Sequence, residues 1–120
     1  MPSILLIEDD ELFRETLAGA LSARGFTVTQ AVDGANGLKL FRAHPTDLVL
    51  TDVVMPNVDG TGVIAELRRQ FPGLGIIAMS GGAAHNPKLY LRIADAMGAD
   101  RTLLKPCALP VLLSAIEEVL

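Results

Sequence analysis

Residues 4–10 read Ile-Leu-Leu-Ile-Glu-Asp-Asp, and they are the clearest indication of the fold. Four consecutive apolar residues that end at three acids are too few for a helix and indicate a short strand buried on both faces. A similar pattern returns at residues 47–52, which read Asp-Leu-Val-Leu-Thr-Asp. Strands buried on both faces are typical of parallel sheets covered by helices, so we expect an α/β fold.

Strand and helix patterns alternate along the whole chain. Apolar residues recur at helical spacing from Glu11, and Gly25, Pro45, Pro72-Gly73 and Gly98 end successive helical stretches. Five strands that alternate with five helices predict right-handed crossovers and one parallel sheet with helices on both faces. The expected strands are residues 4–7, 26–31, 47–52, 75–80 and 102–104, and the expected helices start at residue 11 and cover 35–43, 63–71, 87–97 and the chain from near 109.

Composition limits the function classes. The 120 residues suit one domain, and a net charge of −4 with 4% aromatic residues argues against binding nucleic acid by counterion release or base stacking. Cys107 is the only cysteine, which excludes an internal disulfide. The apolar run at residues 4–7 is too short for a signal peptide or a membrane helix, so we expect a cytoplasmic protein that does not enter a membrane.

Chemically active side chains follow four of the five expected strands. The first strand ends at Glu8-Asp9-Asp10, the third at Asp52, the fourth at Ser80 and the fifth at Lys105. Ligands of open parallel sheets bind beyond the carboxyl ends of the strands, so we expect these side chains to share one site.

The clustered acids predict a bound cation. Two carboxylates about 4 Å apart repel by roughly 4 kcal/mol at an effective dielectric constant near 20, and three such pairs rival the stability of a small domain. Oxygen ligands suit Mg²⁺. A divalent cation together with Lys105 is suited to stabilise a phosphoryl group in transfer, with Asp52 as nucleophile and the Ser80 hydroxyl as donor.

These residues together resemble the receiver domain of two-component response regulators, similar to chemotaxis regulators, over residues 1–120. The resemblance rests on Glu8-Asp9, on Asp52 with the loop after it, on Ser80, and on Lys105-Pro106. It implies a single receiver domain with a flavodoxin-like sheet of strand order 2-1-3-4-5. It also implies a phosphoprotein in signal transduction, which takes a phosphoryl group from a histidine kinase or histidine phosphotransfer protein and thereby switches protein–protein interactions.

The resemblance assigns metal ligands. Asp9 and Asp52 would bind Mg²⁺ directly, Glu8 would bind it directly or through water, and Val54 would contribute its backbone carbonyl. Asp10 would start the first helix instead of binding metal. The cofactor implied is therefore Mg²⁺ alone.

The resemblance also assigns roles in phosphoryl transfer and contact. Asp52 would be the phosphoacceptor, while Lys105 and Ser80 would contact the phosphoryl group; the Lys105–Pro106 peptide would be cis. Such a domain assists its own phosphorylation and dephosphorylation but is not an enzyme for outside substrates. The face formed by the fourth helix, fifth strand and fifth helix would carry a homodimer or an effector; it offers Leu91, Arg92, Asp95 and Arg101.

The sequence departs from the family pattern in three places. Thr102 stands where a switch aromatic is usual, Cys107 stands where Phe usually follows Lys-Pro, and the 25 steps from Ser80 to Lys105 are a few more than usual. None of these changes touches the catalytic groups. We therefore expect phosphoryl transfer to be retained, with activation through movement of the Ser80–His85 loop instead of an aromatic rotamer.

Two alternative functions remain. A pseudo-receiver would bind protein partners without phosphorylation, against which the complete set of acids, Ser80 and Lys105 argues. A magnesium-dependent aspartyl phosphatase usually carries a second acid two residues after its nucleophile, where this chain has Val54.

Overall fold

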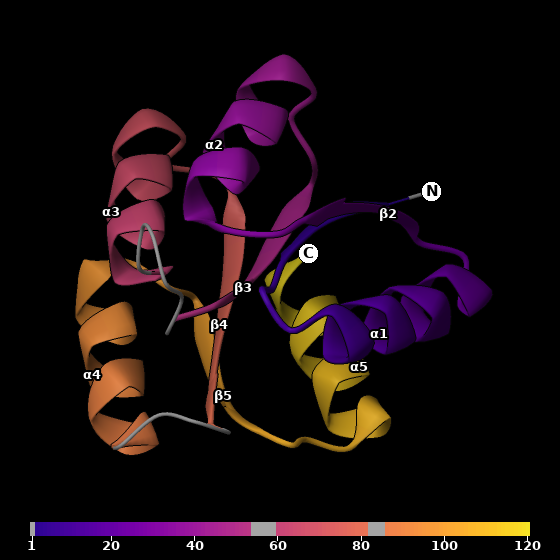
Figure 1. The fold of residues 1–120 in the computed structure, drawn as a ribbon. Coiled ribbons are helices and arrows are strands. Elements are labelled where there is room, and N and C mark those ends of the chain that lie inside the picture. Colours follow the sequence, from indigo (N-terminus) through magenta and orange to yellow (C-terminus); the bar gives the residue numbers. More distant parts are fainter. Residues whose placement is uncertain (1, 54–59, 82–85) are drawn as a thin grey trace.

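The computed structural model describes residues 2–53, 60–81 and 86–120, which form a sheet between two layers of helices (Figure 1). The strand order is β2-β1-β3-β4-β5 and each neighbouring pair is parallel. The expected sheet and its strand order are therefore confirmed. The elements are β1 (Ser3–Ile7), α1 (Glu11–Ala23), β2 (Thr27–Ala31), α2 (Gly34–Ala43), β3 (Leu48–Asp52), α3 (Gly60–Gln70), β4 (Gly75–Gly81), α4 (Pro87–Met97), β5 (Arg101–Lys105) and α5 (Leu109–Val119).

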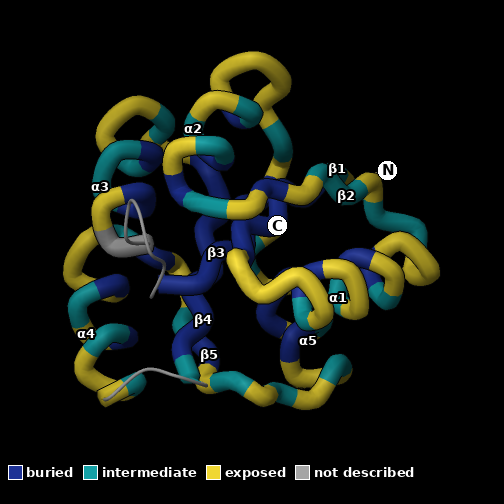
Figure 2. The backbone as a smooth tube through the Cα atoms, viewed as in Figure 1, coloured by how far each residue is buried: buried dark blue, intermediate teal, exposed yellow. Residues whose placement is uncertain are grey.

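Helices α1 and α5 cover one face of the sheet, and α2, α3 and α4 cover the other (Figure 1). Successive residues of β1 alternate between the two layers, because side chains of a strand point to opposite faces in turn. Ile4 and Leu6 pack with α1 and α5, whereas Leu5 and Ile7 pack with α2 and α3. All four are buried, as expected, and Figure 2 shows the central strands as the most buried part of the backbone.

Each strand differs from its expected range by one residue at one or both ends: β1 begins one residue earlier, β3 begins one residue later and β4 ends one residue later. Strand β2 begins at Thr27, since the backbone N–H of Phe26 donates to the Leu21 carbonyl at 3.3 Å and closes the end of α1. Strand β5 is one residue longer at each end, because its pairing with β4 extends over Arg101 and Lys105. Pairing partners lie far away in the sequence, so local patterns do not fix such ends.

Side-chain caps fix the starts of three helices. Asp10 and Asn86 cap α1 and α4 by accepting hydrogen bonds from backbone N–H groups, which confirms both expected helix starts. Asp33 caps α2 in the same way, so this helix begins at Gly34, one residue earlier than expected. Helix α3 begins at Gly60, three residues before its expected start.

Two adjacent arginines, Arg68-Arg69, usually indicate a solvated helix face, but the Arg68 side chain is bound to neighbouring elements. Its guanidinium donates to the backbone carbonyls of Gly98, Pro72 and Leu74 at 3.0, 2.7 and 2.7 Å, and to the Asp100 carboxylate at 2.8 Å. Arg68 therefore ties the end of α3 to the start of β4 and the end of α4. In the described part of the chain, no helix has the length and apolar character needed to cross a membrane.

Candidate functional site

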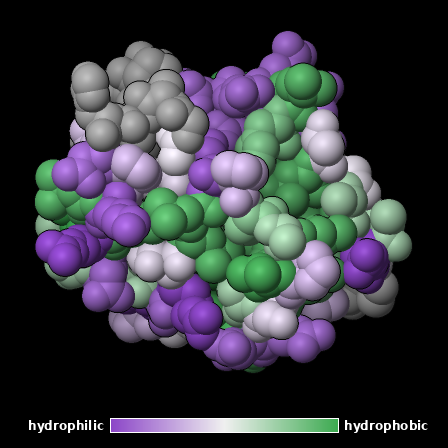
Figure 3. All heavy atoms as spheres, turned by 90° about the horizontal axis from the view of Figure 1, so that it is seen from below, coloured by the Kyte–Doolittle hydropathy of each residue, from purple (hydrophilic) through white to green (hydrophobic). Residues whose placement is uncertain are grey.

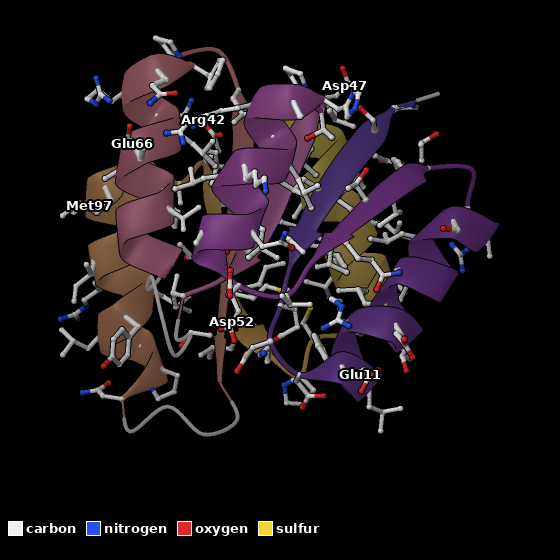
Figure 4. The ribbon with its side chains drawn as sticks, turned by 45° about the horizontal axis from the view of Figure 1, so that its top comes forward. Glu11, Arg42, Asp47, Asp52, Glu66 and Met97 are labelled. Atoms are coloured by element: carbon white, nitrogen blue, oxygen red, sulfur yellow. The ribbon has the colours of Figure 1, made fainter. Side chains whose placement is uncertain are left out.

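The register of the sheet brings the four strand ends together. Ile7 of β1 is aligned with Thr51 of β3, which places Glu8 beside Asp52. Strand β4 pairs with β3 as far as Asp52 and Met79, which places Ser80 one residue beyond, and Lys105 ends β5 against Gly81. The strands meet at the edge that faces down in Figure 1, and Figure 4 shows Asp52 there, at the end of β3. The site expected from the strand ends is therefore formed by the fold.

Three carboxylates form a compact cluster. Glu8, Asp9 and Asp52 each offer one oxygen, and these oxygens lie within 4.8 Å of one another. Glu8 is fully buried, Asp52 is 5% exposed and Asp9 is exposed. Asp10 points its carboxylate to the backbone N–H of Phe13 instead, at 3.0 Å, which agrees with its expected role at the helix start.

Lys105 reaches across the sheet edge into this cluster. Its Nζ lies 2.5 Å from Glu8 Oε1 and 3.4 Å from Asp52 Oδ2, and the side chain is 13% exposed. The Lys105–Pro106 peptide bond is cis, as expected. No local pattern indicates that Lys105 pairs with Glu8, because the two residues are 97 positions apart.

Burial and charge act together on the titration of this cluster. Burial raises the pKa of Glu8 from 4.5 to about 7; the hydrogen bond from Lys105 opposes this shift, and the negative charge of Asp52 adds to it. For Lys105, burial acts to lower the pKa, but the hydrogen bond to Glu8 and the charge of Asp52 outweigh it, so its pKa is raised. Lys105 therefore stays charged, whereas ionisation of Glu8 becomes less favourable.

Ser80 contributes a buried hydroxyl near the same edge. It is fully buried at the penultimate position of β4, and its Oγ has no hydrogen-bond partner among the described residues. A buried hydroxyl without a partner is costly, so native proteins rarely keep one without a functional reason. An oxygen of a bound group would satisfy it.

The donor set fits a hard divalent cation. The cluster offers carboxylate oxygens, which Mg²⁺ prefers, and contains no Cys or His. The pKa of Glu8 is raised mainly by burial and further by the charge of Asp52, and a bound cation would favour the ionised form against both. Val54, expected to supply a backbone carbonyl, lies outside the described residues, as does the segment 82–85 of the loop expected to move on activation.

Two residues of α1 support the site, and the sequence did not single them out for it. Arg14 is buried, with Nη1 donating to the backbone carbonyl of Glu8 at 3.1 Å and Nε donating to Gln30 Oε1 at 3.2 Å. Phe13 places its ring 4.6 Å from the Nζ of Lys105, measured to the ring centroid. Helical spacing marks Phe13 only as part of an apolar face, and neither contact has a signature in the local sequence.

An apolar pocket lies next to the site between α1 and α5. Its volume is about 190 Å³, and Phe13, Leu17, Met79 and Cys107 are among its lining residues. Burial raises the pKa of the Cys107 thiol, which keeps it protonated and makes it a poor nucleophile. Figure 3 shows the molecule from below, and apolar residues gather there on the side formed by α1 and α5.

Comparisons with known proteins agree with this geometry. Residues 4–117 match the family model described as the response regulator receiver domain. The transcriptional regulatory protein AfsQ1 of Streptomyces coelicolor is 38% identical over 120 residues, which cover all of this chain and 52% of that protein. The chain thus spans about half the length of such curated relatives.

Two solved structures show the same fold. A response regulator receiver domain protein from Clostridium thermocellum superposes with a TM-score of 0.91 at 26% identity, covering 99% of this chain and 94% of that one. The response regulator TrrA of Thermotoga maritima, solved in complex with Mg²⁺ and BeF, has a TM-score of 0.87 at 27% identity, with both chains fully covered.

Proposed function

The chain belongs to the response regulator receiver domain family, and on this premise we propose that residues 1–120 form one receiver domain that takes a phosphoryl group on Asp52. A carboxylate oxygen of Asp52 attacks the phosphorus of a phosphohistidine on a histidine kinase or phosphotransfer protein. The new O–P bond forms as the P–N bond breaks, and the imidazole leaves carrying a proton. The product is an acyl phosphate that switches protein–protein interactions.

The observation that carries this proposal is the position of Lys105. Its ammonium lies between Glu8 and Asp52, at 2.5 and 3.4 Å, so a fixed positive charge stands beside the proposed nucleophile. Charge that develops on the oxygens of a transferring phosphoryl group is stabilised by a cation already in place. Once Asp52 is an acyl phosphate, the negative charge lies on the phosphoryl oxygens, and Lys105 is already positioned beside this group to contact them.

Ser80 supports the same step from β4. Its buried Oγ, unpaired among the described residues, is suited to donate a hydrogen bond to a phosphoryl oxygen. That bond would hold the group in a fixed orientation and satisfy a hydroxyl that otherwise stays buried at a cost.

Mg²⁺ is the cofactor that the acids would hold. Glu8, Asp9 and Asp52 would supply carboxylate oxygens, and Val54 its backbone carbonyl. When bound, the ion supplies positive charge that offsets both the repulsion among the acids and the charge of the phosphoryl group.

Output would pass through protein contacts. The surface between α4 and β5 has a shallow hollow lined by Lys88, Leu91, Arg92, Asp95, Thr102 and Leu104. Leu104 is 42% exposed there, surrounded by charges of both signs, which suits a homodimer or an effector. The net charge of −4 argues against direct binding of nucleic acid, and we place this signalling role in the cytoplasm.

Intact mass after incubation with acetyl phosphate tests the proposal. We expect one phosphoryl adduct that requires Mg²⁺ and is lost in Asp52→Asn, with no steady turnover of outside phosphoesters. Asp10→Asn is the matched control, because it changes an adjacent acid that caps α1 and should keep the adduct. An adduct that persists in Asp52→Asn would contradict the assignment, and a folded wild type without adduct would favour the pseudo-receiver.

A further inference from the structure

Phe13 holds its ring against the ammonium of the proposed phosphoryl-binding lysine. The Nζ of Lys105 lies over the ring, 4.6 Å from its centroid. The ring face of an aromatic residue is electronegative and attracts a cation within about 6 Å of the centroid. Lys105 thus has an aromatic neighbour in addition to Glu8 and Asp52.

The backbone of Phe13 is fixed where this contact needs it. Phe13 lies in the first turn of α1, and its N–H donates to the capping Asp10 carboxylate at 3.0 Å. The cap joins the start of α1 directly to the end of β1, where Glu8 lies. The same short segment therefore sets the positions of Glu8 and of the aromatic ring around one ammonium.

The ring restrains the Lys105 ammonium, which the acids alone would draw toward Glu8. Lys105 must remain near Asp52 while Asp52 changes from a carboxylate to an acyl phosphate, yet its ion pair with Glu8 pulls the ammonium toward β1. An aromatic face attracts the cation without neutralising it and without fixing it to one oxygen. Ordering a flexible Lys side chain costs conformational entropy. A contact that already restrains the Lys105 ammonium before phosphoryl transfer therefore favours the reaction.

The Phe13 ring packs against the buried core on the α1 and α5 side of the sheet, but this packing is incomplete. Phe13 is only partly buried, and it lines the pocket of about 190 Å³ between α1 and α5 together with Leu17 and Cys107. A residue beside such a hollow is not held by close-packed neighbours on every side. Its contact with Lys105 therefore represents more than the filling of a core.

From this geometry we propose that Phe13 is a positioning residue for phosphoryl transfer, which acts by holding the Lys105 ammonium through its ring face. This inference rests on the proposed function, since Lys105 must contact the phosphoryl group. Phe13 touches no reacting atom itself. Its effect should appear in the rate of Asp52 phosphorylation and not in the affinity for Mg²⁺.

The test measures phosphorylation by acetyl phosphate at saturating Mg²⁺ in variants of residue 13. Phe13→Leu keeps an apolar side chain but removes the ring, and we expect a rate about fivefold lower. Phe13→Tyr keeps the ring face and should stay within about twofold of wild type. Replacing Phe13 with mono-, di- and trifluorophenylalanine keeps the ring but weakens its electronegative face stepwise, so the rate should fall in the same order.

Two controls separate positioning from packing. Leu17→Ala enlarges the same pocket without touching Lys105, so it should lower stability and leave the rate within about twofold. In a Lys105→Gln background, Phe13→Leu should cause no further loss of rate, because the cation that the ring holds is gone. Mg²⁺ affinity should be the same in Phe13→Leu and wild type.

Each outcome decides between the two proposals. A wild type that forms no adduct refutes both the proposed function and this inference. A wild type that forms the adduct with equal rates across the fluorinated series refutes the role of Phe13 alone. A full loss with Phe13→Leu that persists in the Lys105→Gln background would also overturn it, because the effect would then be independent of the cation.

Discussion

Raising the pH should destabilise the magnesium-free protein through Glu8. Its pKa is about 7 in the folded protein because of burial, against 4.5 ordinarily. Between these values the folded state holds a proton that the unfolded state has released, so stability falls as the pH rises. The difference of about 2.5 pKa units corresponds to about 3 kcal/mol of folding stability. This contribution is fully present below pH 4.5 and is lost once the pH exceeds 7.

Urea unfolding in EDTA at pH 5, 6, 7 and 8 measures this loss. Glu8→Gln keeps the shape of the side chain but cannot ionise, so its stability relative to wild type isolates Glu8 from all other titrating groups. We expect this difference to grow by about 2–3 kcal/mol from pH 5 to pH 8 in favour of Glu8→Gln, because part of the full effect is already lost at pH 5. Glu15→Gln, at an exposed position of α1, should show a difference within about 0.5 kcal/mol throughout.

Addition of Mg²⁺ should remove the effect, because a cation bound to the ionised acids stabilises the folded state. A Glu8→Gln difference that stays constant from pH 5 to pH 8 in EDTA would refute the reasoning. It would mean that the ion pair with Lys105 fully offsets the effect of burial on the pKa of Glu8.

Three further perturbations follow from named contacts. Arg68→Met should lower the free energy of unfolding in urea by about 2–3 kcal/mol, since it removes charged donors from backbone carbonyls such as that of Gly98. The control Arg69→Met changes a more exposed side chain and should lower it by under about 1 kcal/mol. Equal losses would contradict the role of Arg68. Arg14→Met should weaken Mg²⁺ binding about tenfold by calorimetry, because Arg14 holds the carbonyl of a proposed ligand, and unchanged affinity would count against it. Alkylation of Cys107 by iodoacetamide at pH 8 should be several-fold slower in the folded protein than in urea, because burial raises the pKa of its thiol; equal rates in both states would argue against this burial effect.

The sheet and the acids of the site were predictable because their signals are local. An apolar run that ends at an acid marks both the strand and the place where its chain leaves the sheet, as at residues 4–8 and 48–52. Parallel strands deliver their carboxyl ends to one edge, so Glu8, Asp52 and Lys105 could be assigned to a single site before any contact was known. Helix starts marked by a capping side chain, such as Asn86, were predicted for the same reason.

The contacts among those residues needed the tertiary structure. Lys105 could equally have been a solvated lysine, and only the alignment of β5 with β4 brings it against Glu8. No local pattern identifies the partners of Arg68, because the carbonyls that it binds lie at the ends of other elements. Unsatisfied backbone groups at such ends leave no pattern in the sequence that would identify their partner.

Local sequence patterns were enough to predict the succession of strands and helices, the buried faces and the residues at the carboxyl ends of the strands, since each depends on residue types a few positions apart. The folded structure was needed to show how deeply Glu8 is buried, that Ser80 has no partner among the described residues, and that Phe13 faces the ammonium of Lys105. Those properties depend on desolvation and on distances between segments that the chain brings together only by folding.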